Sequence, residues 1–216
     1  MQVSLEEITA NAEQRICHIA RVSNPANQDN PDYARLIRYC IEHQHWSIFE
    51  HSHMTLEIET SLAIATQILR HRSFTFQQFS QRYSDATTLG FEAVQWRKQA
   101  AKNRQGSAEP IDATELTKAL SDHLARGAWL YRQLLEAGVA RECARFVLPQ
   151  CTTTRLYMTG NVRSWIHYLQ LRTQPDTQLE HRQVALAAQR IFVDNLPVIA
   201  EALGWTPPVQ PSAHAA

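Results

Sequence analysis

The stretch HMTLEIETSLAIATQILRHR, residues His53 to Arg72, changes its periodicity halfway and therefore predicts two elements in direct succession. Its first eight residues alternate apolar and polar side chains, which is typical of a strand with one buried face. Ser61 then occupies the N-cap position of a helical pattern whose apolar residues share one face. Because the helix leads into RHR, it delivers Arg70, His71 and Arg72 together into the following loop.

The remainder of the chain predicts further helices and strands without a regular alternation of the two. We expect helices at 31–43 behind an Asn30 cap, at 114–138, at 140–148, at 161–172 behind an Asn161 cap and after Pro175, strands at 90–96 and 152–159, and an exposed loop at 102–114. This mixture indicates an α+β fold, in which a small, mostly antiparallel sheet packs against several helices. We expect a single domain over residues 1–206 and a flexible C-terminal tail over 207–216.

Composition limits the class of ligand. The 21 basic and 21 acidic residues cancel, so no overall field draws the chain to nucleic acid or to a membrane surface. Only three of the basic residues are lysines, and the others are arginines, whose planar guanidinium binds phosphates and carbonyls through paired hydrogen bonds. The four cysteines show no C-x-x-C spacing, and neither a signal peptide nor a membrane-spanning run is apparent. We therefore expect a cytoplasmic protein without a membrane or nucleic-acid partner.

Fixed positive charge is concentrated in RHRSFTFQQFSQRYS, residues 70–84. Arg70 and Arg72 are followed by an uncharged stretch at 73–79 and then by Ser80 and Arg82, and we expect this stretch to be a loop that could fold back around one anion or a pair. The alternative is a set of surface arginines with salt-bridge partners, but Asp85 is the only acid close by in sequence. The cluster therefore predicts a negatively charged ligand.

The aromatic residues in this stretch leave two classes of anion open. Phe74, Phe76, Phe79 and Tyr83 interleave with the charges, which would suit a stacking platform for single-stranded nucleic acid. Yet no further basic stripe extends the patch, so phosphate contacts would be few and a small nucleotide suits the scale better. The six glycines are too scattered for a P-loop or a dinucleotide fingerprint, so side chains must hold any phosphates.

A second polar segment, HQHWSIFEHSH, carries histidines at alternate positions: His43, His45, His51 and His53. Such spacing would suit a metal on a strand, but Glu50 is the only nearby acid and no partner ligand lies at a finger-like distance. We therefore predict no metal site. For His51, a ligand-binding role and a structural role both stay open.

Two arginines lie four residues apart in the predicted helix 140–148. Arg141 and Arg145 share one face of that helix, and Glu142 and Glu180 are available acids. Taken alone, these residues indicate intrahelical salt bridges.

Together, these segments resemble the flavin-dependent thymidylate synthases, the ThyX family. RHR followed by seven residues and SxR, as in Arg70–Arg72 and Ser80–Arg82, resembles the signature of that family. Further resembling segments follow in the order of the family: FEH at 49–51, the helix with Gln67 that leads into RHR, ARECARFVLP at 140–149, NVRSWIHYLQLR at 161–172 and TQLEHR at 177–182. The resemblance extends from His45 to Leu196, which is most of the chain.

The resemblance implies a homotetramer whose active sites are shared between subunits. It also implies bound FAD, reducing equivalents from NADPH, a one-carbon unit from methylenetetrahydrofolate, and methylation of dUMP at C5 to give dTMP.

The resemblance assigns a role to individual residues. Those expected to face FAD are His51, Arg70, His71, Arg72, Asn161, Arg163 and His167. Those expected to face dUMP are Gln67, Ser80, Arg82, Arg145 and Arg172, with Ser80, Arg82 and Arg145 on the phosphate. Arg172 is the expected catalytic residue, because a fixed guanidinium against the uracil oxygens stabilises the negative charge that develops when C5 becomes electron-rich.

Three positions depart from the family pattern. Gln78 stands where many relatives carry an acid, Asp176 where they carry a histidine, and His167 where asparagine is common. We still expect Gln78 at the cofactor, and Gln81, inside SxR, at the substrate. The alternatives are a flavoprotein with lost or altered methyl transfer, an RNA- or single-strand-binding module, and a structural oligomer whose arginines lie in subunit salt bridges.

Overall fold

The pairing of two nine-residue strands organises the computed structural model, which describes residues 1–205. Strands β2 (His53–Ser61) and β6 (Thr153–Asn161) are antiparallel and paired along their full length, from His53 opposite Asn161 to Ser61 opposite Thr153. The flanking strands β1 (Gln2–Ile8) and β3 (Thr75–Gln78) complete a four-stranded sheet in the order β1-β2-β6-β3. All neighbours are antiparallel, so the predicted α+β class and sheet are confirmed.

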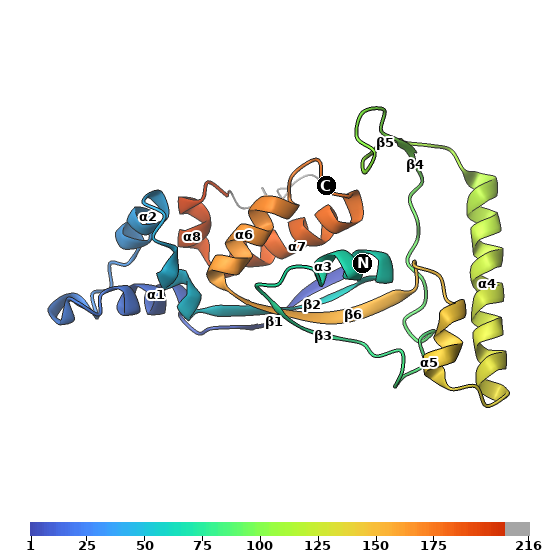
Figure 1. The fold of residues 1–216 in the computed structure, drawn as a ribbon. Helices are drawn as coiled ribbons and strands as arrows, with labels where there is room; N and C mark the ends of the chain where they lie inside the picture. The colour runs from blue at the N-terminus through green and yellow to red at the C-terminus, as the bar shows by residue number, and fades with distance from the viewer. Residues whose placement is uncertain (206–216) are drawn as a thin grey trace, which may run out of the picture.

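Helices α3, α6, α7 and α8 lie above one face of this sheet in Figure 1, and α1 and α2 lie at one end. Helix α4 stands at the opposite end, beside α5 and away from the sheet. The α-helices are α1 (Ala12–Ala20), α2 (Ala34–Glu42), α3 (Leu62–Ile68), α4 (Thr114–Glu136), α5 (Arg141–Ala144), α6 (Val162–Arg172), α7 (Leu179–Asn195) and α8 (Pro197–Ala202). The chain also forms a hairpin of β4 (Arg97–Gln99) and β5 (Ser107–Pro110), and 3-10 turns η1 (Pro25–Asn27), η2 (Trp46–His51) and η3 (Arg145–Val147).

Each central strand continues directly into a helix, and the two junctions are capped differently. At the start of α6, the Asn161 side chain accepts a hydrogen bond from the Ser164 N–H at 2.8 Å, as a predicted N-cap should. Ser61 occupies the cap position of α3, but its side chain makes no cap bond. Instead, the Leu62 N–H donates to the Thr152 carbonyl at 3.0 Å. The backbone just before β6 therefore satisfies the first N–H group of this helix.

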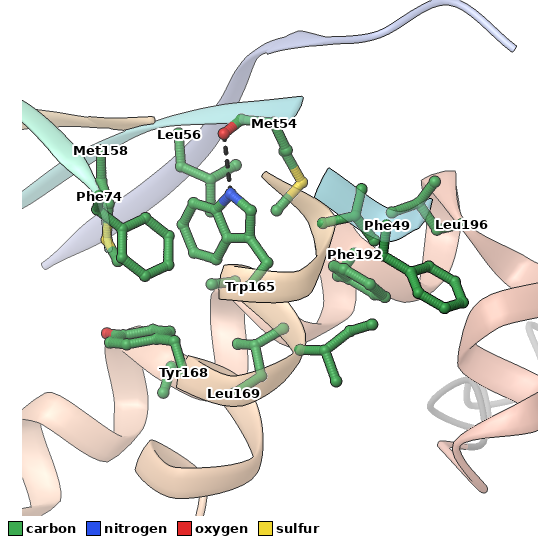
Figure 2. Packing of buried hydrophobic residues seen from close by; sticks show 14 of the residues in the cluster. Phe49, Met54, Leu56, Phe74, Met158, Trp165, Tyr168, Leu169, Phe192 and Leu196 are labelled. Atoms are coloured by element: carbon green, nitrogen blue, oxygen red, sulfur yellow. Dashed lines mark hydrogen bonds between the residues drawn. The ribbon is translucent and has the colours of Figure 1, made fainter. Parts of the chain in front are cut away.

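The core lies between the sheet and the helices above it. The apolar residues of the alternating strands, including Met54, Leu56 and Met158, are buried on that face. The Trp165 indole N–H donates to the Met54 carbonyl at 2.8 Å (Figure 2), which ties α6 to β2. Phe74 packs edge-on against Trp165 with ring centroids 4.9 Å apart. Burial of these aromatic rings stabilises the contact between the sheet and the helices above it.

Several local predictions are wrong in detail. Helix α2 begins at Ala34, not at Pro31, because the Asn30 side chain accepts from the Asp32 N–H and forms a turn there. Residues 90–96 form no strand and contribute only a bridge from Phe91 to Thr152. The expected loops at 73–79 and 102–114 instead contain β3 and β5. Strand β1 and helices α1 and α8 were not predicted from the sequence.

Both sheet edges are irregular or short. The pairing of β1 shifts register between Leu5 and Glu7, which is a bulge, and β3 spans only four residues. No helix in residues 1–205 combines the length and apolarity needed to cross a membrane. The predicted flexible tail at 207–216 lies outside the described residues.

Gly160→Ala is expected to destabilise the fold. A Cβ at this position of β6 would lie 2.4 Å from Cδ1 of the buried Phe74 ring. We expect the free energy of unfolding to fall by about 1–3 kcal/mol in chemical denaturation, because an overpacked core must displace a ring. Gly127→Ala in α4 is the matched control, since its Cβ would meet only the Val147 carbonyl at 3.6 Å. Equal losses in both variants would contradict the steric explanation.

Candidate active site

Eight of the fourteen side chains predicted to bind ligands fall into three groups on the described chain. One group lines a groove at the start of α6, a second forms a hydrogen-bonded cluster where α3, α6 and α7 meet, and a third surrounds the loop after β3. The groove and the loop cavity share no lining residue. A single chain therefore presents the predicted site in parts.

The groove at the start of α6 brings together three of the predicted cofactor contacts. Asn161, Arg163 and His167 line it, and its volume is about 580 Å³. The amide of Asn161 is engaged as the helix cap, and the Arg163 guanidinium pairs with Glu50, also in the groove wall. His51, which follows Glu50 in the sequence, is exposed and does not line the groove. The groove thus offers hydrogen-bond donors with a partly neutralised charge.

The second group joins His71 to Arg172. The Arg172 Nε–H donates to His71 Nε2 at 2.9 Å, so the imidazole proton must lie on Nδ1. Burial and the charges of Arg172 and His167 lower the pKa of His71 to about 4, so the ring is neutral at pH 7. An uncharged acceptor holds the guanidinium without neutralising it. Arg172 therefore keeps its full charge and its remaining N–H donors.

The same cluster contains His181 and Tyr168, which were not predicted as site residues. His181 of α7 is fully buried; its Nε2 lies 3.1 Å from the Tyr168 hydroxyl and its Nδ1 lies 3.3 Å from Gln67 Oε1. Burial, then the charges of Arg172 and His71, lower the pKa of His181 to about 3. A histidine on the apolar face of an amphipathic helix was the available signal, but it did not identify a partner.

Gln67 continues this cluster toward the β4–β5 hairpin. The Gln67 amide donates to Gln178 Oε1 at 2.6 Å, and the Gln178 amide donates to Glu180 Oε2 at 3.0 Å. Arg97 of β4 binds Glu180 with Nη1 to Oε1 at 2.7 Å and Nη2 to Oε2 at 3.0 Å. Glu180 therefore pairs across the fold with the hairpin, and the expected intrahelical salt bridge is wrong.

The third group surrounds the loop after β3. Ser80 and Arg82 line a cavity of about 320 Å³ together with Arg141 and Glu142. Arg82 pairs with Glu142, Nη2 to Oε2 at 3.0 Å, although the two are distant in sequence. The expectation that Arg82 lacks a compensating acid is therefore wrong, and Glu142 does not pair within its own helix. Both side chains are more than half exposed, so the pair is weak and exchangeable.

The other predicted residues lie outside these three groups. Gln78 donates to Thr154 Oγ1 on β6 at 3.2 Å, which is against the sheet. Gln81 keeps a buried Nε2 without a hydrogen-bond partner in residues 1–205. Arg145 lies over the Phe146 ring at 5.9 Å. Arg70 and Arg72 are exposed and form no ion pair within the described chain.

Two of the four histidines in the histidine-rich segment contact one tyrosine ring. The His43 ring stacks on Tyr39 with centroids 4.1 Å apart, and His45 contacts the same ring edge-on at 5.8 Å. In the part of the chain that the structure describes, no three His, Cys, Asp or Glu residues are grouped so that they could hold a metal ion.

Comparisons with known proteins agree on one family. The family model described as "Thymidylate synthase complementing protein" matches residues 4–198. A protein of Synechocystis sp. named "Flavin-dependent thymidylate synthase" is 52% identical over 88% of this chain and 88% of its own. A protein of Paramecium bursaria Chlorella virus 1 named "Probable flavin-dependent thymidylate synthase" is 48% identical over 90% and 91% of the two chains. The UMP/dUMP methylase PolB from Streptomyces cacaoi, solved with 5-Br dUMP, superposes with a TM-score of 0.79 at 28% identity and covers 94% of each chain.

Stability is expected to fall as the pH is lowered below about 6.5. The pKa of His181 is about 3 in the folded chain against an ordinary 6.5, so between these values the unfolded chain binds more protons. The contribution is complete above the unfolded value and is lost as the pH falls toward the folded one. From pH 7 to pH 5 this group should remove about 2 kcal/mol from the free energy of unfolding.

The matched variant is His181→Asn, which does not titrate. Its denaturant-derived stability should lose about 2 kcal/mol less than the wild type over the same pH range, at one fixed protein concentration. The groups that face the ring are Arg172 and Tyr168 of α6 and His71 after α3, and they stay unchanged in this variant. Identical pH profiles would contradict a buried neutral His181.

Proposed function

The chain belongs to the family of flavin-dependent thymidylate synthases, and from this premise we propose that it methylates dUMP at C5 to give dTMP with FAD as its bound cofactor. NADPH as reductant and methylenetetrahydrofolate as one-carbon donor complete the proposal. The dUMP methylase PolB, whose fold is shared along 94% of both chains, supports the choice of a pyrimidine nucleotide as substrate.

One observation carries the proposal: a half-buried, uncompensated guanidinium at Arg172, held by the neutral His71. Methylation at C5 requires the uracil ring to become electron-rich, and negative charge then develops on its carbonyl oxygens. A preorganised donor against those oxygens stabilises that charge more in a dry site than in water. A carboxylate in place of His71 would form an ion pair with Arg172 and neutralise the positive charge that the uracil requires.

The groove at the start of α6 is the proposed flavin site. Its lining joins the indole of Trp46 to the polar groups of Arg163, His167 and Gln170, which suits a ring system that also carries amide and phosphate oxygens. Arg70 and Arg72, without ion pairs in residues 1–205, are the proposed phosphate ligands. FAD, when bound, supplies the hydride and one-carbon chemistry, so the protein needs to supply orientation and charge.

The cavity after β3 is the proposed site of the dUMP phosphate. Ser80 offers a hydroxyl and Arg82 a planar guanidinium that binds phosphate in bidentate geometry. Arg145 is proposed as a further ligand. Because the Arg82–Glu142 pair is exposed, a dianionic phosphate can replace the carboxylate at small loss. Gln78 and Gln81 stay proposals at the cofactor and the substrate.

A homotetramer with shared active sites is the proposed assembly. Helix α4 has 23 residues, of which Tyr131 is the one that is buried. Leu116 and Trp129 on this helix are 62% and 52% exposed, and Phe146 on η3 is 82% exposed. Burial of such large exposed apolar side chains against another subunit is the proposed role of these elements. Shared sites would also explain why one chain presents the predicted residues in parts.

The alternative of a single-strand-binding module loses its main support. A stacking platform needs exposed rings, but Phe74 is buried against Trp165 and only Tyr83 of the four aromatics in that stretch is exposed. An FAD- and nucleotide-binding flavoprotein with altered methyl transfer remains the second candidate, because Gln78 and Asp176 depart from the family pattern.

Compartment and domain extent belong to the same proposal. Four free cysteines, including the exposed Cys143, suit a reducing cytoplasm. The main core joins the sheet to α1, α2, α3, α6, α7 and α8, and a second, small cluster around Tyr131 and Ala144 joins α4 to α5. A single domain over residues 1–206 stays the proposal.

Arg172→Ala is expected to abolish most of the activity. Tritium release from C5-tritiated dUMP should fall by at least roughly 100-fold, because the variant lacks the donor that stabilises developing charge on the uracil. Flavin absorbance should persist. Arg190→Ala, an exposed position of α7, is the matched control and should release tritium at the wild-type rate.

The same assay decides between the two candidate functions. Wild-type release should require FAD, NADPH and methylenetetrahydrofolate, each omitted in turn. A yellow protein that binds dUMP but releases no tritium would overturn methyl transfer and favour the altered flavoprotein.

Trp129→Glu is expected to break the assembly. A charge in place of the half-exposed Trp129 indole opposes burial against another subunit, so light scattering should report a mass below the tetramer. Val22→Glu, at an apolar position beyond α1 that is also more than half exposed, should leave the mass unchanged. A tetramer that persists in Trp129→Glu would exclude this face from the interface.

A further inference from the structure

The cluster around His181 forms a continuous hydrogen-bonded chain across the fold. It runs from Tyr168 through His181 and Gln67 to Gln178 and ends at Glu180. The last member is held by Arg97 of the hairpin. Gln67 is the member of this hydrogen-bonded series with a proposed ligand contact, so the other members can affect the ligand through Gln67.

The charge at the end of the chain determines the direction of every bond in it. Glu180 is a carboxylate paired with Arg97, so it only accepts, and Gln178 must turn its amide N–H₂ toward it. The Gln178 oxygen then faces Gln67, which must donate in turn. Gln67 Oε1 is consequently directed at His181, whose Nδ1 must carry the proton.

Tyr168 completes this assignment from the other end. A neutral imidazole with its proton on Nδ1 has an acceptor at Nε2, and the Tyr168 hydroxyl lies 3.1 Å away and donates to it. Burial raises the pKa of the Tyr168 hydroxyl, so the group keeps its proton. Both ring nitrogens of His181 are therefore satisfied, with one tautomer imposed from each side.

We propose that His181 is a positioning residue that holds the Gln67 amide in a single orientation for dUMP. A free glutamine amide flips between two nearly isosteric states, whereas here Oε1 is turned to His181 and one N–H to Gln178. The second N–H of Gln67 and a lone pair of its oxygen remain for a ligand. The imide edge of uracil, which offers both a carbonyl and an N–H, is the chemical class that this pair fits.

This inference rests on the proposed function, because it takes dUMP as the ligand of Gln67. A purely structural His181 would also be buried and hydrogen-bonded. The two roles depend on different ring nitrogens. Positioning requires the Nδ1–H that donates to Gln67, whereas core stability also uses the bond between Nε2 and Tyr168.

Two substitutions separate the nitrogens. In His181→Asn the side-chain amide lies where Nδ1 was and can still donate to Gln67, and in His181→Gln it reaches the place of Nε2 and Tyr168 instead. We expect the dissociation constant of dUMP for the FAD-loaded protein, measured by calorimetry, to rise about tenfold in His181→Gln and less than about threefold in His181→Asn.

A double-mutant cycle with Gln67→Ala supplies the decisive control. If His181 acts through Gln67, His181→Gln should change dUMP affinity by less than about twofold in the Gln67→Ala background. Equal losses in Asn and Gln variants, or a tenfold loss that persists without Gln67, would overturn the positioning role. Wild-type holoprotein that does not bind dUMP would instead overturn the proposed function, and this inference with it.

Discussion

The nine-residue antiparallel pairing of β2 with β6 is the constraint on which the rest of the fold depends. Because both strands run straight into helices, their common register places the start of α3 and the start of α6 at opposite ends of the sheet. The alternation in β2 turns Met54, Leu56 and Ile58 toward the helices. A slip of one residue would turn them away and separate Trp165 from its carbonyl acceptor.

That register also decides where polar groups are dehydrated. The ends of α3 and α6 approach the first turn of α7, and two imidazoles and a tyrosine are packed there around Arg172. Keeping His71 and His181 neutral avoids the burial of two further positive charges beside the guanidinium. The neutral states of His71 and His181 therefore lower the cost of burial and also leave the charge of Arg172 available to the substrate. The cluster is in this sense both a structural and a proposed functional unit.

Sequence periodicity predicted the elements that form through local interactions, but it did not predict contacts between segments that are distant in the sequence. The strand at 53–60 and the capped helix at 161–172 follow from patterns that need no partner. Pairings such as Arg82 with Glu142 and Arg97 with Glu180 join distant segments, and no local pattern contains them. The residues expected to contact FAD and dUMP follow from resemblance to a family, and their ligand contacts stay predictions. His181 lies in the TQLEHR segment, but its sequence position alone predicts no role for it.

The two outer strands of the sheet affect whether copies of this protein can aggregate by strand pairing. An open sheet offers unpaired N–H and C=O groups along its outer strands, which invite strand addition by other chains. Here β1 carries a bulge and the adjacent acids Glu6 and Glu7, and β3 is too short to template a long partner. Both outer strands are therefore poor seeds for aggregation, so association is left to the helical surfaces, where side chains rather than backbone decide the partner.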